Sequence, residues 1–364
     1  MNPRVEVKLN KLKQNVQQIV GLCEGKGISV AGVTKCFCAL PEIAQVYVDG
    51  GCKFLADSRL ENLEKLKDFD LPRMMLRLPM ISKAAETVRH SEISLNSEVE
   101  TIRALNQAAQ AQGLTHQIIL MVDLGDLREG FYYEKKLYAS LEEILEFKSI
   151  QVIGIGVNLT CFGGVIPDED NLSRLVTIKE QIKSKYNLDL ELISGGNSSS
   201  LHLVLEDALV DGINNLRIGE AFLLGRETAY GENIPGTEKD VFTLVAEIIE
   251  LKDKPTMPTG KIGKNAFGET PEFEDLGIRK SAICAIGQQD VDPGDLTPED
   301  PGDLTPEDPG VQIKGASSDH LVLDLTDSKL DYQVGSEIRF STNYGAILST
   351  MTSPYVNKEL IAED

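Results

Sequence analysis

The sequence has few basic residues relative to acidic ones, no long apolar run and no cysteine pairing motif. Its 36 Lys and Arg against 57 Asp and Glu give a net charge of −21 at pH 7. This balance argues against nucleic acid or an anionic membrane as a partner, because both need basic patches. No run approaches about 18 apolar residues, so we expect no membrane-spanning helix. The N-terminal residues lack an apolar core with a cleavage site, and the six cysteines form no CxxC pair, so we expect reduced thiols in the cytoplasm and no signal peptide.

Motifs of several common enzyme classes are also missing. The four histidines show no HxxH or HExxH spacing, so no metal site is expected. No GxSxG marks a serine hydrolase, and no GxGxxG follows the first predicted strand, which weakens a dinucleotide-binding sheet. The composition, with 41% hydrophobic and 26% charged residues, is nevertheless that of a globular protein.

The 364 residues show a regular alternation of β-rich runs and helical patterns. A chain of this length suits two domains. Eight strand candidates separated by helices predict a parallel sheet in an α/β fold, and eight strands close a (β/α)8 TIM-type barrel. An open doubly wound sheet is the alternative. The eight runs are Ile28–Thr34, Lys53–Ala56, Arg73–Leu78, Glu92–Leu95, Gln117–Asp123, Gln151–Val157, Leu190–Ser194 and Asn215–Ile218.

After about Gly231 the helical patterns disappear, which predicts a C-terminal all-β domain. The N-terminal run Arg4–Leu9 alternates polar and apolar residues and suits an extra strand of that domain. We therefore predict a barrel over residues 10–230 and a β domain made of 231–364 plus 1–9. The expected strands are Val241–Leu251, Lys280–Ile286, His320–Leu325 and Ser336–Ser341.

An acidic tandem repeat interrupts the β domain. The octapeptide PGDLTPED occurs at 293–300 and again at 301–308. Proline and glycine at this density disfavour both helices and sheet ladders. The segment is therefore expected to be a solvated loop that a duplication has lengthened.

Candidate catalytic residues are sought at the C-terminal ends of the barrel strands, where such barrels place their active sites. Lys35 directly follows the first strand, where a desolvated amine can form a Schiff base or act as a base; the commoner alternative is a lysine that has reached solvent. The turn SGGNSSS at 194–200 offers backbone amides and hydroxyls to an anion, or is a plain N-cap. Arg217 alternates with apolar neighbours and should face inward. Arg128 lies in a glycine-rich loop after the fifth strand, with surface ion pairs as the alternative.

These features together resemble one family. The chain is similar to the fold-type III pyridoxal-phosphate enzymes of the alanine racemase type, and within them to the alanine/ornithine racemase group. The resemblance covers nearly the whole chain, and it rests on the order and number of the motifs rather than on any single one. The matching segments are VTKCFCA, DLGDLREG, NSSSL, LRIGEAFLLG, GASSDHLVLDLTD and TNYG.

The resemblance implies pyridoxal 5'-phosphate as the cofactor, with Lys35 holding it as an aldimine. Asn197 and Ser198 would belong to the phosphate turn, with the Gly219 region beside them. Tyr344, in the asparagine–tyrosine motif, would be a further phosphate ligand.

The resemblance also implies how the substrate is handled. Arg217 would meet the pyridine nitrogen, and because its own pKa exceeds about 12 it would leave that nitrogen unprotonated, which favours proton return over transamination. Arg128 would face the substrate carboxylate, with Asn158 also near the substrate. Ser318 and Asp319 would enter the neighbouring subunit's site, so that a homodimer would share its active sites.

Three positions depart from the family pattern and favour the ornithine-type branch. Gln288 stands where the family has the catalytic tyrosine of a GYADG turn, and glutamine cannot abstract a proton. Asn158 replaces a histidine, and Ala39 replaces the tyrosine that follows the cofactor lysine. The base on the second face is therefore left open. The candidates are Asp319, Asp290 and His320, the only histidine beside an aspartate.

We therefore predict an isomerase: a pyridoxal-phosphate-dependent amino-acid racemase that acts on ornithine or another basic or broad-range amino acid. Lys35 would be the base on one face of Cα. The first alternative is a fold-type III basic amino-acid decarboxylase, but such enzymes place a cysteine where GASSDH has none. The others are a non-catalytic pyridoxal-phosphate carrier, which would lack the second domain, and a sugar-phosphate barrel enzyme that forms a Schiff base.

Overall fold

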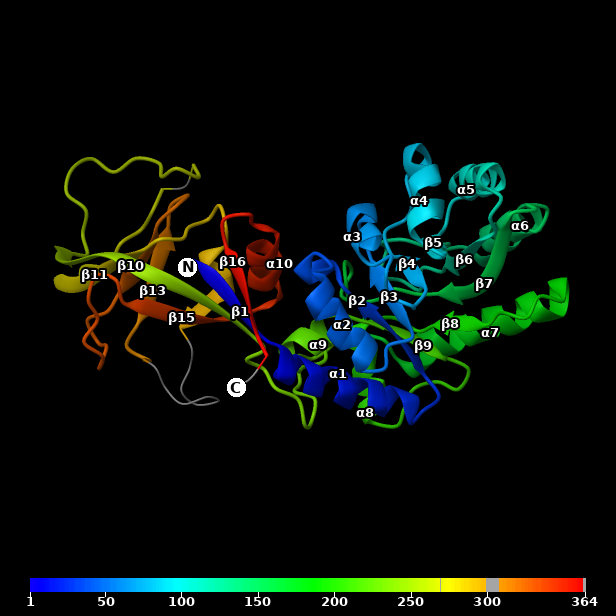
Figure 1. The fold of residues 1–364 in the computed structure, drawn as a ribbon, viewed down its shortest axis with the longest axis horizontal. Helices are drawn as coiled ribbons and strands as arrows, with labels where there is room; N and C mark the ends of the chain where they lie inside the picture. Colours follow the sequence, from blue (N-terminus) through cyan, green and yellow to red (C-terminus); the bar gives the residue numbers. More distant parts are fainter. Residues whose placement is uncertain (269, 299–307, 363–364) are drawn as a thin grey trace. The chain divides into compact units, whose positions relative to one another are not determined.

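The computed structural model describes residues 1–268, 270–298 and 308–362. The chain divides into two compact units (Figure 1). The barrel unit is Lys11–Lys239, and the β unit combines Met1–Asn10 with Asp240–Asp364. Within the described ranges, no helix combines the length and the apolar character needed to cross a bilayer.

Eight parallel strands form a closed barrel, which confirms the predicted (β/α)8 fold. Each predicted run overlaps one of these strands. The last strand pairs with the first through Gly32 and Ile218, which closes the barrel. The strands are β2 (Ser29–Val33), β3 (Phe54–Asp57), β4 (Arg73–Met75), β5 (Ile93–Asn96), β6 (His116–Met121), β7 (Ile150–Gly156), β8 (Leu192–Ser194) and β9 (Asn215–Ile218).

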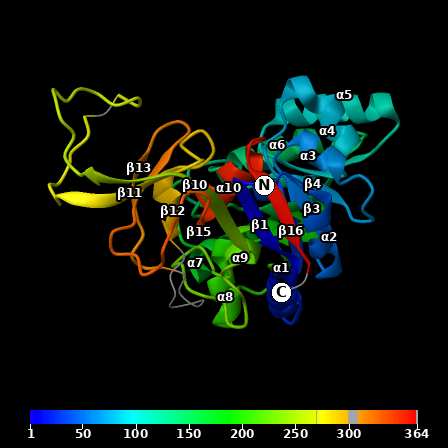
Figure 2. The same ribbon diagram turned by 60° about the vertical axis from the view of Figure 1, so that its left-hand side comes forward.

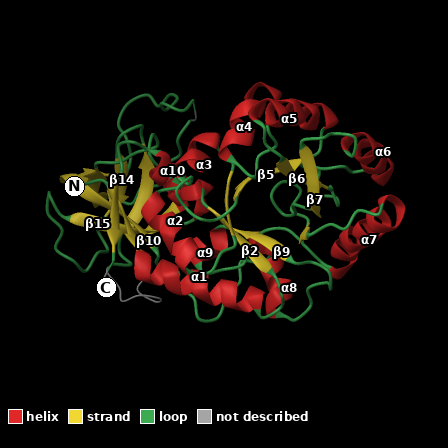
Figure 3. Cartoon of the chain, turned by 45° about the vertical axis from the view of Figure 1, so that its right-hand side comes forward, coloured by secondary structure: helices red, strands yellow, loops and turns green. Residues whose placement is uncertain are grey.

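Helices surround these strands (Figure 3). Local signals set their ends: Asp168 and Asn171 form a reciprocal capping box at the start of α7, and Gly113 ends α5 with a φ of 68°. The α-helices are α1 (Leu9–Glu24), α2 (Pro41–Asp49), α3 (Leu60–Lys65), α4 (Ala84–His90), α5 (Val99–Gln112), α6 (Glu134–Ile144), α7 (Glu169–Tyr186), α8 (Leu201–Leu205) and α9 (Glu220–Leu224). Short 3-10 helices are η1 (Lys35–Phe37), η2 (Ile81–Lys83) and η3 (Ser198–Ser200).

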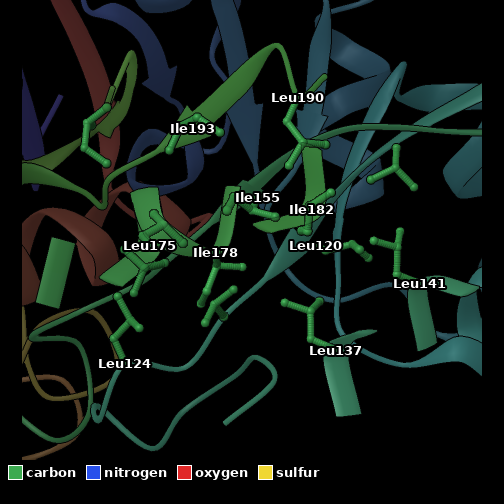
Figure 4. Close-up of a cluster of buried hydrophobic side chains, with 14 of the residues drawn as sticks. Leu120, Leu124, Leu137, Leu141, Ile155, Leu175, Ile178, Ile182, Leu190 and Ile193 are labelled. Carbon is green, nitrogen blue, oxygen red and sulfur yellow. The ribbon is translucent and has the colours of Figure 1, made fainter. Parts of the chain in front are cut away.

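Two of the buried apolar clusters in the barrel unit contain residues of the barrel strands. Side chains such as Ala31, Ile119 and Met121 form one buried cluster drawn from several barrel strands. A second cluster joins β6–β8 to helices α5–α7 (Figure 4), and includes Leu120, Leu137, Leu141, Ile155, Leu175, Ile178 and Ile182. Burial on both faces explains why the barrel strands read as short continuous apolar runs.

The β unit is built on an eight-stranded sheet whose long strand β10 pairs with β11 as an antiparallel ribbon (Figure 2). Strand β1 from the N-terminus lies between β10, to which it is antiparallel, and β16, to which it is parallel. The strands are β1 (Arg4–Lys8), β10 (Phe242–Pro255), β11 (Ile278–Cys284), β12 (Leu296–Pro298), β13 (Gln312–Ala316), β14 (Leu321–Asp324), β15 (Glu337–Thr342) and β16 (Asn357–Ile361).

Two features of this unit differ from expectation. Helix α10 (Tyr344–Thr352) was not anticipated in a domain read as all-β. The start of the first PGDLTPED copy forms a 3-10 turn, η4 (Pro293–Asp295), and the edge strand β12, so the expectation of neither helix nor ladder is wrong there. An edge strand tolerates proline because one side of it needs no partner. Residues 299–307 of the repeat lie outside the described residues.

Candidate functional site

The C-terminal ends of the barrel strands gather most of the polar residues singled out from the sequence. Because all eight strands are parallel, these ends share one rim of the barrel. Lys35 follows β2, Arg128 follows β6, Asn158 follows β7, and the turn 195–200 follows β8. Arg217 and Gly219 belong to β9 and its end.

The side chain of Lys35 is exposed, but hydrogen bonds hold the backbone next to it in place. Its neighbour Thr34 is fully buried; the Thr34 amide donates to Ala56 O at 2.9 Å and its hydroxyl to Asp57 Oδ2 at 2.7 Å. Asp57 also accepts from the Arg59 amide and from Asn62. Burial raises the pKa of Asp57, and these hydrogen bonds oppose the rise. The backbone beneath Lys35 is therefore fixed, while its amine remains open to reactants.

The turn after β8 has the features of an anion site. Gly196 has a φ of 119°, and a Cβ there would lie 2.6 Å from Ser200 Oγ, so glycine is required. Asn197 caps η3 by accepting from the Ser199 amide at 2.8 Å. The Ser199 hydroxyl is buried and makes no hydrogen bond to any described residue. A buried polar group without a partner is costly, and here it marks a place for a ligand.

Ser198 joins this turn to the end of β9. Its Oγ accepts from the Gly219 amide at 3.4 Å and from the Ala221 amide at 3.2 Å. A serine oxygen that accepts two hydrogen bonds still has its own hydrogen to donate. Gly219 packs so closely on β2 that a Cβ would lie 3.1 Å from Val33 Cβ. The two strand ends thus form one small cradle with a hydroxyl donor, which suits a phosphate group.

Arg217 lies inside the barrel with 4% of its surface exposed, as the alternation predicted. Its guanidinium donates to Ser194 Oγ on β8 at 2.5 Å and to Val157 O beyond β7 at 2.6 Å. Both acceptors are neutral, and no carboxylate in the described ranges forms an ion pair with it. Burial lowers the pKa of Arg217 to about 10, so the group stays charged at neutral pH. A buried cation without an ion-pair partner disfavours folding, which indicates a functional role.

Two loops on the rim are tied together by a buried aspartate. Asp126, in the loop after β6, accepts from the amides of Phe162, Gly163 and Val165 in the loop after β7. In the first loop, Arg128 forms an ion pair with Glu129. The rigid frame suits a residue that must hold a ligand in one position.

The loop after β7 connects back to the anion turn. Asn158 is buried and accepts from Asn197 Nδ2 at 3.2 Å, while its own Nδ2 has no partner among the residues described. Cys161 is exposed, and its sulfur lies 3.6 Å from Asn158 Oδ1 and 3.5 Å from Asn197 Nδ2. Asn158 is thus placed next to the turn with a donor to spare.

Glu220 brings an acidic group to the same rim. It follows Gly219 and pairs with Arg226 at 3.3 Å. Burial raises the pKa of Glu220, while Arg226 and Lys35 oppose that rise. Strands β2 and β9 are neighbours, as the pairing of Gly32 with Ile218 shows. Lys35 follows β2 and Glu220 follows β9, which explains why the charge of Lys35 acts on the Glu220 carboxylate.

The remaining predicted residues belong to the β unit. The turn from Ser317 to His320 joins β13 to β14, and Ser318 and Asp319 are exposed on it. This turn packs on Gly287, where a Cβ would lie 2.4 Å from Ser318 O. Asp290 is buried and accepts from Ser353 Oγ at 2.6 Å, so its carboxylate is less accessible than that of Asp319.

Tyr344 is the first residue of α10, directly after the cap Asn343, whose side chain accepts from the Ala346 amide at 3.0 Å. Its position is thereby fixed within the β unit.

Sequence reasoning missed five groups that shape the rim. Glu129 and Glu220 each directly follow a predicted residue, and Asp57 directly follows the predicted strand Lys53–Ala56, so their positions carried a signal. Asp126 and Cys161 carried none, because their importance depends on contacts with residues distant in the sequence. The five are Asp57, Asp126, Glu129, Cys161 and Glu220.

Comparison with known proteins gives two kinds of similarity. The family model described as "Alanine racemase, N-terminal domain" matches residues 7–226. An ornithine racemase from Acetoanaerobium sticklandii is 48% identical over 361 residues, which is 99% of this chain and 100% of that protein. A lysine racemase from Thermotoga maritima is 37% identical over 358 residues, 98% of each chain.

Among solved structures, an alanine racemase from Clostridium difficile 630 has a TM-score of 0.72 at 17% sequence identity, with 100% of this chain and 96% of that chain covered. At this identity the likeness shows the fold, a barrel combined with a mostly β domain.

Proposed function

The chain belongs to the alanine racemase family, and we propose that it interconverts the enantiomers of a basic amino acid with pyridoxal 5'-phosphate as cofactor. One observation carries the proposal most strongly. Arg217 is a buried cation without an ion pair, held by neutral acceptors on the rim that also has Lys35 and an anion cradle. Such an arrangement disfavours the empty protein and is useful only with a ligand.

The residues present fit this cofactor. The cradle of Asn197, Ser198 and Gly219 offers a hydroxyl donor and a glycine at close backbone approach for the phosphate. Lys35 offers an exposed amine for the carbonyl group, and Arg217 a guanidinium for the ring nitrogen. When bound, the cofactor draws electrons from Cα of the substrate, which makes the α-proton easier to remove.

The chain's own residues then manage the proton. Lys35 is the base on one face of Cα, and the bonds of Thr34 to Ala56 and Asp57 hold its backbone still. Arg217 retains its proton at neutral pH, because even after burial its pKa is about 10. It therefore does not donate that proton to the ring, which favours returning the proton to Cα over transamination.

We assign the base on the second face to Asp319, and we assign Ser318 to the substrate and Tyr344 to the phosphate. The exposure of Asp319 on its turn supports this choice over the buried Asp290. His320, exposed on the same turn, is the remaining alternative. By family resemblance, Ser318 and Asp319 come from a second copy of the chain, so the enzyme is a homodimer with shared active sites.

Ornithine is the first substrate to test, followed by lysine, because the named activities of the two whole-length relatives are ornithine and lysine racemisation. Arg128 binds the substrate carboxylate, since guanidinium and carboxylate form paired hydrogen bonds. Asn158, with its free Nδ2 donor, lies beside the anion turn and contacts the substrate.

The test of the cofactor lysine is chemical trapping. Borohydride reduction of the cofactor-loaded protein should fix the cofactor on the peptide that contains Lys35, as seen by mass spectrometry. Lys35→Ala should show no such peptide and should lose nearly all racemisation of ornithine. Modification at another lysine would refute the assignment.

The shared site is tested by mixing two inactive variants. Lys35→Ala and Asp319→Asn are combined under conditions that exchange subunits. Half of the dimers become mixed, and each mixed dimer carries one intact site, so about a quarter of parent activity should return. No recovery despite proven exchange would contradict the shared site, and an active Asp319→Asn would discard Asp319 as a base.

A further inference from the structure

Arg128 and Glu129 are consecutive residues whose side chains form an ion pair, and the backbone around them is unusual. Leu127 has a φ of 60° and Gly130 a φ of 125°, so left-handed residues flank the pair on both sides. A Cβ on Gly130 would lie 2.5 Å from the Asp123 amide nitrogen, so only glycine fits. A non-glycine residue such as Leu127 is strained in this conformation. The loop is therefore held in this shape by its surroundings, including the contacts of Asp126 with the neighbouring loop.

The two side chains form a two-pronged ion pair. Glu129 accepts from Arg128 Nε through one carboxylate oxygen and from Nη2 through the other. The Glu129 side chain is 13% exposed and that of Arg128 40%, so the carboxylate lies beneath the guanidinium. Nη1 of Arg128 makes no hydrogen bond to any residue in the described part of the chain. One edge of the guanidinium is thus fixed, and the Nη1 group remains available to an anion.

Arg128, Glu129 and Arg217 lie close enough to influence one another's charge. Glu129 also stabilises the charged form of Arg217, and Arg128 destabilises it, so all three groups act on one another. Arg217 forms no ion pair with any described carboxylate, and Asp126 stabilises the charged form of Arg128 together with Glu129.

We propose that Glu129 is a positioning residue that fixes Arg128 for recognition of the substrate carboxylate; this rests on the proposed function. Glu129 does not touch the substrate itself. It sets the direction of Arg128 and restricts the rotamers that a half-exposed arginine would otherwise sample. The consequence is selectivity for an amino acid over the diamine that lacks the carboxylate.

The experiment compares two ligands that differ only in that carboxylate. The cofactor-loaded parent and Glu129→Gln are titrated with ornithine and with 1,4-diaminobutane, and both dissociation constants are measured by calorimetry. Glu129→Gln should bind ornithine about tenfold more weakly and the diamine within about twofold of the parent. The matched control is Glu134→Gln, which removes an Arg–Glu pair at 3.0 Å to Arg174 and should change neither constant.

The melting curve of Glu129→Gln shows whether this variant folds. If it does not fold, a second variant provides the test. Glu129→Asp keeps the charge with a shorter reach, and it should lose ornithine affinity with no loss for the diamine. Equal weakening of both ligands would indicate a merely structural role and would overturn the proposal, as would unchanged ornithine binding.

Arg128→Met separates this inference from the proposed function. It should weaken ornithine binding, and adding Glu129→Gln to it should have no further effect. If Arg128→Met weakens ornithine binding and Glu129→Gln does not, only the role of Glu129 fails. If Arg128→Met has no effect, the assignment of Arg128 to the carboxylate fails and the inference fails with it. If the parent does not bind ornithine, the proposed substrate is wrong.

Discussion

Replacing Arg217 by methionine should remove activity without weakening the fold. Burial lowers the pKa of this arginine from its ordinary value to about 10. One pKa unit corresponds to about 1.4 kcal/mol, so the charged form is destabilised by about 3 kcal/mol in the folded state. Because the folded pKa is the lower one, this penalty is present in full below about pH 10 and disappears as the pH rises towards the ordinary pKa of arginine.

Methionine removes that penalty and also removes two hydrogen bonds. Each is worth about 1 kcal/mol net, and Ser194 keeps a partner because its hydroxyl still donates to Asn215 at 2.6 Å. The Val157 carbonyl loses its donor, so the two effects nearly cancel and the free energy of unfolding should change by no more than about 1 kcal/mol, measured by urea denaturation of the cofactor-free protein at pH 7. In the same variant, racemisation of ornithine should fall to background.

A matched truncation shows that the assay responds to lost packing. Ile119→Ala, at a fully buried position of the barrel, should cost about 2–5 kcal/mol. A similar loss in the free energy of unfolding of Arg217→Met would refute the reasoning, because the arginine would then stabilise the barrel rather than serve ligand binding.

Two further predictions concern the supports of the catalytic groups. Thr34→Val removes a hydrogen bond to Asp57, which should cost about 2 kcal/mol at pH 7. The pKa of Asp57 is raised in the fold, so this loss should shrink as the pH falls through that pKa towards 3.8, and an equal loss across urea titrations at all pH values would contradict it. Gly287→Ala places a Cβ 2.4 Å from backbone of the turn that carries Asp319, so activity should fall and the melting temperature should drop, whereas Gly263→Ala, with nothing within 4 Å, should change neither. Unchanged activity in Gly287→Ala would argue against a role for that turn.

The barrel was predictable because its strands carry their signal locally. Runs such as Gln117–Asp123 are apolar on both faces and are bounded by helical patterns, and each lies over an observed strand. Arg217 was predictable for the same reason, since its alternation with apolar neighbours on β9 fixed its inward direction. The order of the motifs along the chain made the family predictable as well.

The features that could not be predicted from the sequence depend on contacts between residues that are distant along the chain. Strand β12 exists because Leu296–Pro298 pairs with β15, more than 40 residues later, which outweighs the local effect of proline. The Asp126 carboxylate accepts hydrogen bonds from backbone amides around Gly163, which belongs to another loop. The need for glycine at position 287 comes from the turn at Ser318, which no local pattern reveals.

The central claim is that this chain moves the α-proton of a basic amino acid between the two faces of Cα. The most direct measurement follows each enantiomer of ornithine in deuterated water by nuclear magnetic resonance, with the cofactor-loaded protein present. Either enantiomer should give an equal mixture of both, with deuterium at Cα and no diamine. Formation of 1,4-diaminobutane with carbon dioxide, or an unchanged α-proton in both enantiomers, would contradict the account.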